Sequence, residues 1–139
     1  MDRKKLSKIK KDLAFLENFP EIHSVLLFGS YASGEVTQRS DIDVCIVIPY
    51  EKDEKIVNRI YGIVVSKLSN KPEYDISIFE QLPLYIKAEV IENHIIIFSR
   101  DELELYEYFY FYRKLWNDQK HRQQVTKDEL MRILQKKHT

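Results

Sequence analysis

The spacing of hydrophobic positions changes several times between residues 4 and 98. Apolar residues that recur every three or four positions predict amphipathic helices, which we expect over residues 4–19, 53–68 and 84–93. Short apolar runs rich in β-branched residues predict buried strands, which we expect over residues 23–28, 41–48, 74–79 and 94–98. This order predicts an α/β (α+β) fold, with a small mixed β-sheet of three to four strands and flanking helices.

The pattern changes after residue 100. Residues 103–120 contain neither glycine nor proline and predict one long helix. Thr126 and Glu129 then fit a capping box, which predicts that a separate last helix starts there. We therefore expect a domain at residues 1–100 and a helical C-terminal extension at residues 101–139.

The extension carries four of the nine tyrosines within residues 106–112, followed by Trp116. A helix distributes these aromatic rings over more than one face, so we expect some of them to stay exposed. Tyrosine and tryptophan are frequent anchors of protein interfaces. We predict that Tyr108, Tyr112 and Trp116 bind a partner protein, with packing of this helix against the sheet as the alternative.

Composition is typical of a globular domain, with 44% hydrophobic and 32% charged residues among 139. The formal net charge is zero, which disfavours general binding to a nucleic-acid backbone. A single cysteine excludes a disulfide framework and a cysteine zinc site. The sequence contains neither an apolar run of about 18 residues nor a signal-peptide pattern. We expect a cytoplasmic protein with no membrane segment and no direct nucleic-acid partner.

Candidate chemistry begins where the first predicted strand ends, at Gly29 and Ser30. Glycine lets a backbone approach a ligand closely, and amide groups at the start of a following turn can bind an anion. The Ser30 hydroxyl would add a further donor. Gly34 belongs to the same turn of small residues.

Acidic residues mark the starts of the next two strands. Asp41 and Asp43 are two positions apart, so a strand directs both side chains to one face. Adjacent carboxylates repel one another unless a cation lies between them, and Mg²⁺ commonly takes one or two carboxylates together with phosphate oxygens. Asp75 adds a third acid if its strand adjoins the first pair. The alternatives are a polar hairpin with capped strand ends and, for Asp75, a solvated strand start.

With Gly29-Ser30 and Ser40-Asp41-Ile42-Asp43, residues 22–98 resemble the minimal nucleotidyltransferases (MNT), small members of the DNA polymerase β-like superfamily. The resemblance implies the nucleotidyltransferase fold. It assigns nucleotide binding to Gly29, Ser30 and Ser40, and Mg²⁺ and triphosphate binding to Asp41 and Asp43. It assigns Asp75 to a second metal ion and to deprotonation of the attacking hydroxyl.

The resemblance also implies an activity. Many MNT proteins are antitoxins of HEPN-domain ribonuclease toxins, which implies transfer of AMP from ATP to a tyrosine of such a partner. One alternative is a non-catalytic antitoxin that masks the toxin with the helix at residues 103–117, and another is a stand-alone enzyme acting on a small molecule or RNA end. One position departs from the family, since Ser33 stands where many members have arginine; Arg39 is a candidate substitute.

Overall fold

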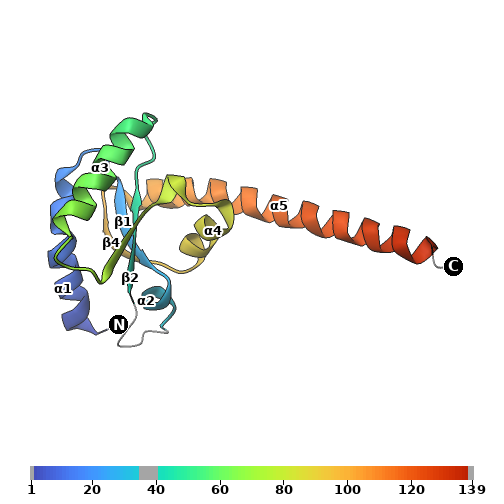
Figure 1. Ribbon diagram of the computed structural model, residues 1–139, viewed down its shortest axis with the longest axis horizontal. Helices are drawn as coiled ribbons and strands as arrows, with labels where there is room; N and C mark the ends of the chain where they lie inside the picture. The colour runs from blue at the N-terminus through green and yellow to red at the C-terminus, as the bar shows by residue number, and fades with distance from the viewer. Residues whose placement is uncertain (1, 35–40, 138–139) are drawn as a thin grey trace.

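A four-stranded mixed sheet lies between two helical layers in the computed structural model, which describes residues 2–34 and 41–137 (Figure 1). The strand order is β3-β2-β1-β4, with β1 antiparallel to both neighbours and β3 parallel to β2. The predicted small mixed sheet is therefore confirmed. The elements are α1 (Arg3–Leu13), β1 (Ser24–Phe28), α2 (Ser30–Ser33), β2 (Ile42–Val47), α3 (Glu54–Lys67), β3 (Tyr74–Ile78), α4 (Leu84–Glu92), β4 (Ile95–Ser99) and α5 (Glu102–Lys137).

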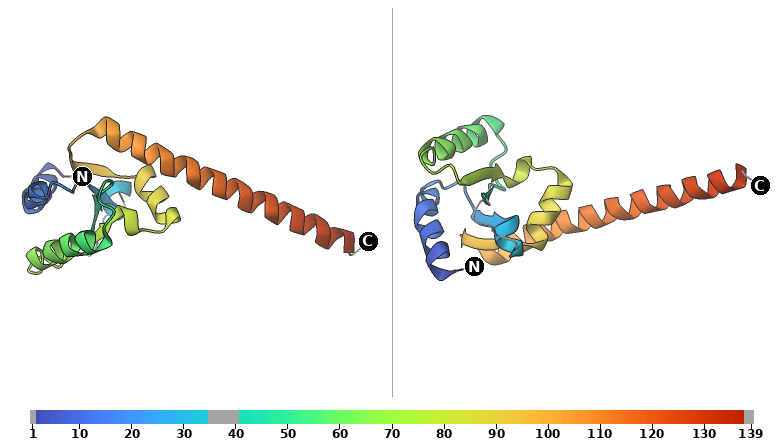
Figure 2. Two further views of the ribbon diagram at one scale, coloured as in Figure 1. Left: turned by 90° about the horizontal axis from the view of Figure 1, so that it is seen from above. Right: turned by 60° about the horizontal axis from the view of Figure 1, so that its bottom comes forward.

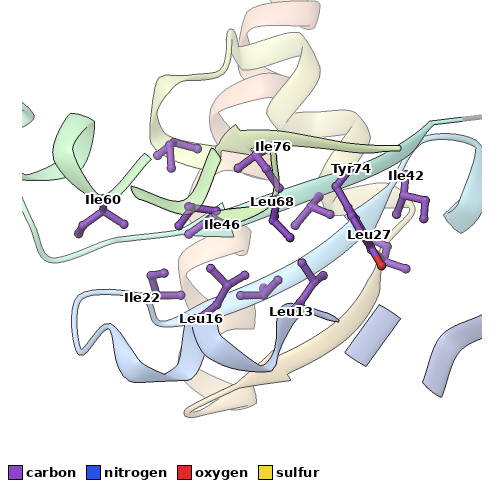
Figure 3. Packing of buried hydrophobic residues seen from close by; sticks show 14 of the residues in the cluster. Leu13, Leu16, Ile22, Leu27, Ile42, Ile46, Ile60, Leu68, Tyr74 and Ile76 are labelled. Atoms are coloured by element: carbon purple, nitrogen blue, oxygen red, sulfur yellow. The ribbon is translucent and has the colours of Figure 1, made fainter. Parts of the chain in front are cut away.

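One face of the sheet is covered by α1 and α3, which lie on the same side in Figure 1. Their apolar faces follow the predicted helical spacing, since Ile9 and Leu13 of α1 and Ile60 and Val64 of α3 are buried. Figure 3 shows these helices meeting the alternate strand residues that point to them. Short 3-10 turns at Ala14–Asn18 and Phe79–Gln81 extend the buried surface.

The opposite face is covered by α4 and the first part of α5, as both views in Figure 2 agree. Phe79 lies at the centre of this second core, with its ring centroid 5.2 Å from that of Phe109. Leu26, Cys45 and Leu105 are also fully enclosed there. Because both faces of the central strands are buried, β1 and β2 are almost continuously apolar.

The helix α5 is one continuous element of 36 residues, so the predicted break before a separate helix at residues 127–137 is wrong. Residues 121–129 contain neither glycine nor proline, and Thr126 sits within the helix instead of capping it. A side-chain hydrogen bond from Gln124 Nε2 to Asp128 Oδ1 at 3.0 Å spans one turn of this segment. Figure 1 shows the second half of α5 projecting away from the rest of the chain.

The expected boundary after residue 100 crosses the second core. Leu105 and Phe109 of α5 are 1% and 2% exposed and pack with residues of the sheet and α4. The first turns of the extension thus belong physically to the same packed unit as residues 1–100. None of the helices in the described part of the chain is both long enough and apolar enough to cross a membrane.

Phe109→Ala is expected to lower the free energy of unfolding by about 3–5 kcal/mol, because the change leaves a cavity beside Phe79. Urea denaturation measures this loss. Tyr110→Ala is the matched control on the same helix, since Tyr110 is 65% exposed; its effect should stay within about 0.5 kcal/mol. Equal losses for the two variants would contradict the packing of α5 on the sheet.

Candidate active site

The turn after β1 depends on the absence of a side chain at Gly29. Gly29 has a φ of 68°, a conformation that favours glycine. A Cβ atom added there would collide with the Asp43 carboxylate. The main chain of the turn and this acid are therefore in direct contact, which brings the two predicted halves of the site together.

Backbone hydrogen bonds define the short helix α2 that follows. The amides of Ala32 and Ser33 donate to the Gly29 carbonyl oxygen at 3.1 and 3.0 Å, and Gly34 ends the turn with a φ of 82°. The Ser33 hydroxyl donates to the Ser30 carbonyl oxygen at 3.3 Å. Ser30 is half-buried at the start of this turn, beside Gly29.

Asp43 and Asp75 are direct register partners in the neighbouring parallel strands β2 and β3. Register partners in adjacent strands point to the same face of a sheet, so these two carboxylates lie side by side. Asp41 immediately precedes β2 and is exposed, whereas Ser40 lies outside the described residues. Asp75 is exposed on the edge strand β3. Its carboxylate is therefore in contact with solvent and needs no buried partner to offset a cost of desolvation.

The proximity of the acids changes the electrostatics of Asp43. Partial burial raises the pKa of its carboxyl above 3.8, and the negative charges of Asp75 and Asp41 raise it further. A divalent cation would relieve this repulsion, and Mg²⁺ characteristically completes its shell with ligand oxygens and water. Within residues 2–34 and 41–137, no three acidic, histidine or cysteine side chains already form a metal-binding group. The arrangement therefore offers a pair of carboxylates flanked by Asp41.

An open cavity of about 880 Å³ begins at Gly29, Ser30 and Ser33 and extends between α4 and α5. Trp116 lines it from the α5 side, so this predicted partner-binding residue lies close to the turn that contacts Asp43. The lining also includes residues that the sequence reasoning did not single out. They are Tyr85, Ala88, Glu89, Glu92 and Asn93 of the α4 region, and Asn117 and Lys120 of α5.

Tyr108 and Tyr112 pack within the chain, at the far end of the strands from Asp43. Both rings contact Phe79, with centroid separations of 5.8 and 5.4 Å. The Tyr108 hydroxyl donates to Glu80 Oε2 at 2.7 Å. Their predicted partner-binding role thus competes with a role in the second core, whereas Tyr106, Tyr110 and Phe111 are the exposed aromatic residues of this stretch.

Glu80 is a half-buried acid that the sequence reasoning missed. Its Oε1 accepts a hydrogen bond from the Ile48 amide at 2.9 Å, so it joins the end of β2 to Tyr108 of α5. Burial raises the pKa of the Glu80 carboxyl, against the opposing effects of these donors and of Lys87. The sequence does contain a signal for this role, because Glu80 lies in a stretch that also holds Ile78, Phe79 and Leu82.

The chain is similar in sequence to known proteins. Residues 8–103 match the sequence profile of the family described as polymerase beta, nucleotidyltransferase. A protein of Methanocaldococcus jannaschii named "Putative protein adenylyltransferase MJ1547" is 50% identical over 102 residues, which cover 73% of this chain and 75% of that protein.

Solved structures resemble the fold over most of its length. A chain in a crystal structure of a toxin–antitoxin with AMP-PNP aligns with a TM-score of 0.61 at 20% identity, covering 91% of this chain and 98% of that one. A chain in a structure of a tri-AMPylated HEPN toxin with its MNT antitoxin, from Shewanella oneidensis, aligns with a TM-score of 0.60 at 18% identity. The coverage there is 94% of this chain and 99% of that one.

Asp43→Asn is expected to raise the melting temperature by a few degrees at neutral pH in metal-free buffer. Because the folded chain raises the pKa of Asp43 above its ordinary value of 3.8, the ionised carboxylate opposes folding. The stability contributed by the protonated form is complete below the unfolded pKa and is lost as pH rises through the folded pKa. The advantage of the variant should therefore disappear on acidification to about pH 3.

Thermal unfolding monitored by circular dichroism across this pH range measures the difference. Asp118→Asn removes an exposed acid on α5 as a matched control and should leave the pH dependence unchanged. A wild-type chain that is more stable than Asp43→Asn at neutral pH would contradict a raised pKa of Asp43 in the folded chain.

Proposed function

Because the chain belongs to the polymerase β-type nucleotidyltransferase family, we propose that it transfers AMP from Mg²⁺-bound ATP to a tyrosine hydroxyl of a HEPN-domain ribonuclease toxin. Modification of the toxin would make this protein its antitoxin. The observation that carries the proposal is the direct pairing of Asp43 with Asp75, next to a turn whose Gly29 contacts Asp43.

The acidic pair fits a divalent cation that is shared with a nucleotide. Two carboxylates and the triphosphate together supply the kind of oxygen ligands that Mg²⁺ prefers. Burial raises the pKa of Asp43, the negative charges of Asp75 and Asp41 raise it further, and a bound cation would offset that repulsion. Mg²⁺, when bound, would neutralise charge that develops on the phosphate oxygens. Asp41, Asp43 and Asp75 are the residues that would hold it.

The reaction is an in-line displacement at the α-phosphorus. The tyrosine oxygen of the acceptor forms a bond to this phosphorus as the bond to the β-phosphate oxygen breaks, and diphosphate leaves. Asp75 would take the hydroxyl proton, for which an exposed carboxylate on the edge strand is suited, since the acceptor can reach it. Gly29 and Ser30, in the turn that contacts Asp43, would orient the phosphates.

The choice of acceptor is supported by the relatives and by the shape of α5. The Methanocaldococcus protein is named for protein adenylylation, and a structurally similar chain occurs in a complex that contains an AMPylated HEPN toxin. The projecting half of α5 exposes large apolar side chains, a feature that marks protein-binding surfaces. They are Val125, Leu130, Met131, Ile133 and Leu134.

Adenylylation is tested by incubating the purified chain with Mg²⁺-ATP and a HEPN-domain protein with which it forms a complex, followed by intact-mass spectrometry. The toxin should gain one or more AMP units, and tyrosine→Phe substitution at the modified position should abolish the gain. Asp75→Asn should slow the transfer by roughly 10²-fold or more, since it removes the proposed base. Asp118→Asn is the matched control and should retain the wild-type rate.

Steric masking is the second candidate, and the exposed apolar face of α5 favours it. Under masking, the toxin would be inhibited with no gain in mass, and Asp43→Asn would inhibit as well as the wild type. That result would refute the transferase proposal. Loss of protection in Asp43→Asn, with an intact complex, would refute masking.

Contact through α5 is tested by Leu130→Ser combined with Leu134→Ser, two exposed residues one helical turn apart. Loss of apolar contact should weaken the complex with the HEPN protein by at least about tenfold, measured by calorimetry. Gln135→Ser on the same exposed segment is the control and should bind normally. Unchanged affinity in the double variant would remove the projecting half of α5 from the interface.

A further inference from the structure

The cavity between α2, α4 and α5 has the dimensions of a nucleotide site. Its volume of about 880 Å³ falls within the range of small-molecule pockets. It opens at Gly29 and Ser30, and Gly29 lies against the Asp43 carboxylate. A ligand in this cavity would therefore reach the acidic pair with one end and α5 with the other.

The charges around the cavity do not by themselves favour a polyphosphate. Glu89 and Glu92 line it from α4, and Asp43 lies against Gly29, which also lines it. Arg113 approaches Glu92 at 3.8 Å, but this pair is largely exposed and contributes little. Lys120 is the one cationic side chain among the described residues that line the cavity.

Lys120 is held toward the cavity by its own helix. Its ammonium lies over the ring of Trp116, 5.8 Å from the ring centroid and one helical turn away. A cation over an indole ring is attracted by the electron density of the ring face, which restricts an otherwise flexible side chain. Trp116 also lines the cavity, so the pair presents an aromatic surface and a positive charge on one wall.

We propose that this cavity binds the nucleoside triphosphate and that Lys120 pairs with its β- and γ-phosphates, an inference that rests on the proposed function. The C-terminal extension then completes the nucleotide site. Ser33 lines the same cavity, but its hydroxyl is uncharged and donates to a backbone carbonyl. The positive charge therefore comes from α5, across the cavity from this turn.

Trp116 is the single tryptophan of the chain, so its fluorescence reports on this cavity directly. Titration of the full-length wild type with Mg²⁺ and AMP-PNP should change the emission saturably. Lys120→Gln should raise the dissociation constant about tenfold, because a charge-assisted contact is lost. The same variant should bind AMP, which lacks the β- and γ-phosphates, as the wild type does.

Three further variants separate a charge effect from a structural one. Lys120→Arg should restore AMP-PNP binding, as should Ser33→Arg introduced into the Lys120→Gln chain, which returns a cation to the same cavity. Lys114→Gln on the same helix removes an exposed lysine that does not line the cavity, and should bind normally.

Two results for Lys120→Gln would overturn the assignment of Lys120: wild-type affinity for AMP-PNP, or an equal loss of affinity for AMP and AMP-PNP. Weaker AMP-PNP binding in Arg39→Gln but not in Lys120→Gln would also overturn it. Absence of any saturable fluorescence change in the wild type would overturn the placement of the nucleotide. Lysine-dependent binding without AMP transfer to the toxin would instead refute the proposed function and leave the nucleotide seat intact.

Discussion

The hydrogen-bonded pairing of two parallel strands holds the carboxylates of Asp43 and Asp75 side by side, and the sheet cannot move them apart. Gly29, the residue after β1, contacts the same site, since a Cβ atom added there would collide with the Asp43 carboxylate. Folding thus concentrates negative charge beside a main chain that leaves room for a ligand. Burial of the Asp43 carboxyl raises its pKa, the charges of Asp75 and Asp41 raise it further, and a bound cation would offset the repulsion between these acids.

The face of the sheet that carries these acids also carries the second core. Along β2, Asp43, Cys45 and Val47 point to this face, and the last two pack against α4 and α5. The same helices that bury the far end of the face leave the cavity open near Gly29. A single packing arrangement therefore stabilises the sheet and forms the walls of the proposed nucleotide seat.

Three regions with different surroundings follow one another along α5. Its first turns are core, anchored by Leu105, Phe109 and the hydrogen bond from Tyr108 to Glu80. Its middle, at Trp116 and Lys120, faces the cavity, and its last turns project with apolar residues exposed. Because one continuous helix connects these regions, a partner bound around Leu130 would lie about 15 Å along the helix axis from Lys120.

Local pattern predicted most of the elements, since spacing and β-branched runs report directly on which faces are buried. It also predicted the site segments, because Gly29-Ser30 and Asp41-Ile42-Asp43 are short motifs whose chemistry depends on near neighbours in the chain.

Tertiary packing decided the rest. The continuity of α5 through Thr126 is an exception that remains local, since neither glycine nor proline interrupts residues 121–129. Which aromatic residues of α5 face inward depended on the position of Phe79, a residue far away in sequence. The sequence by itself thus determined the secondary structure and the acidic motif, which arise from neighbouring residues. The meeting of Asp75 with Asp43, and of Lys120 with the Gly29 turn around one cavity, required strands and helices distant in the chain to be brought together by burial of their apolar faces.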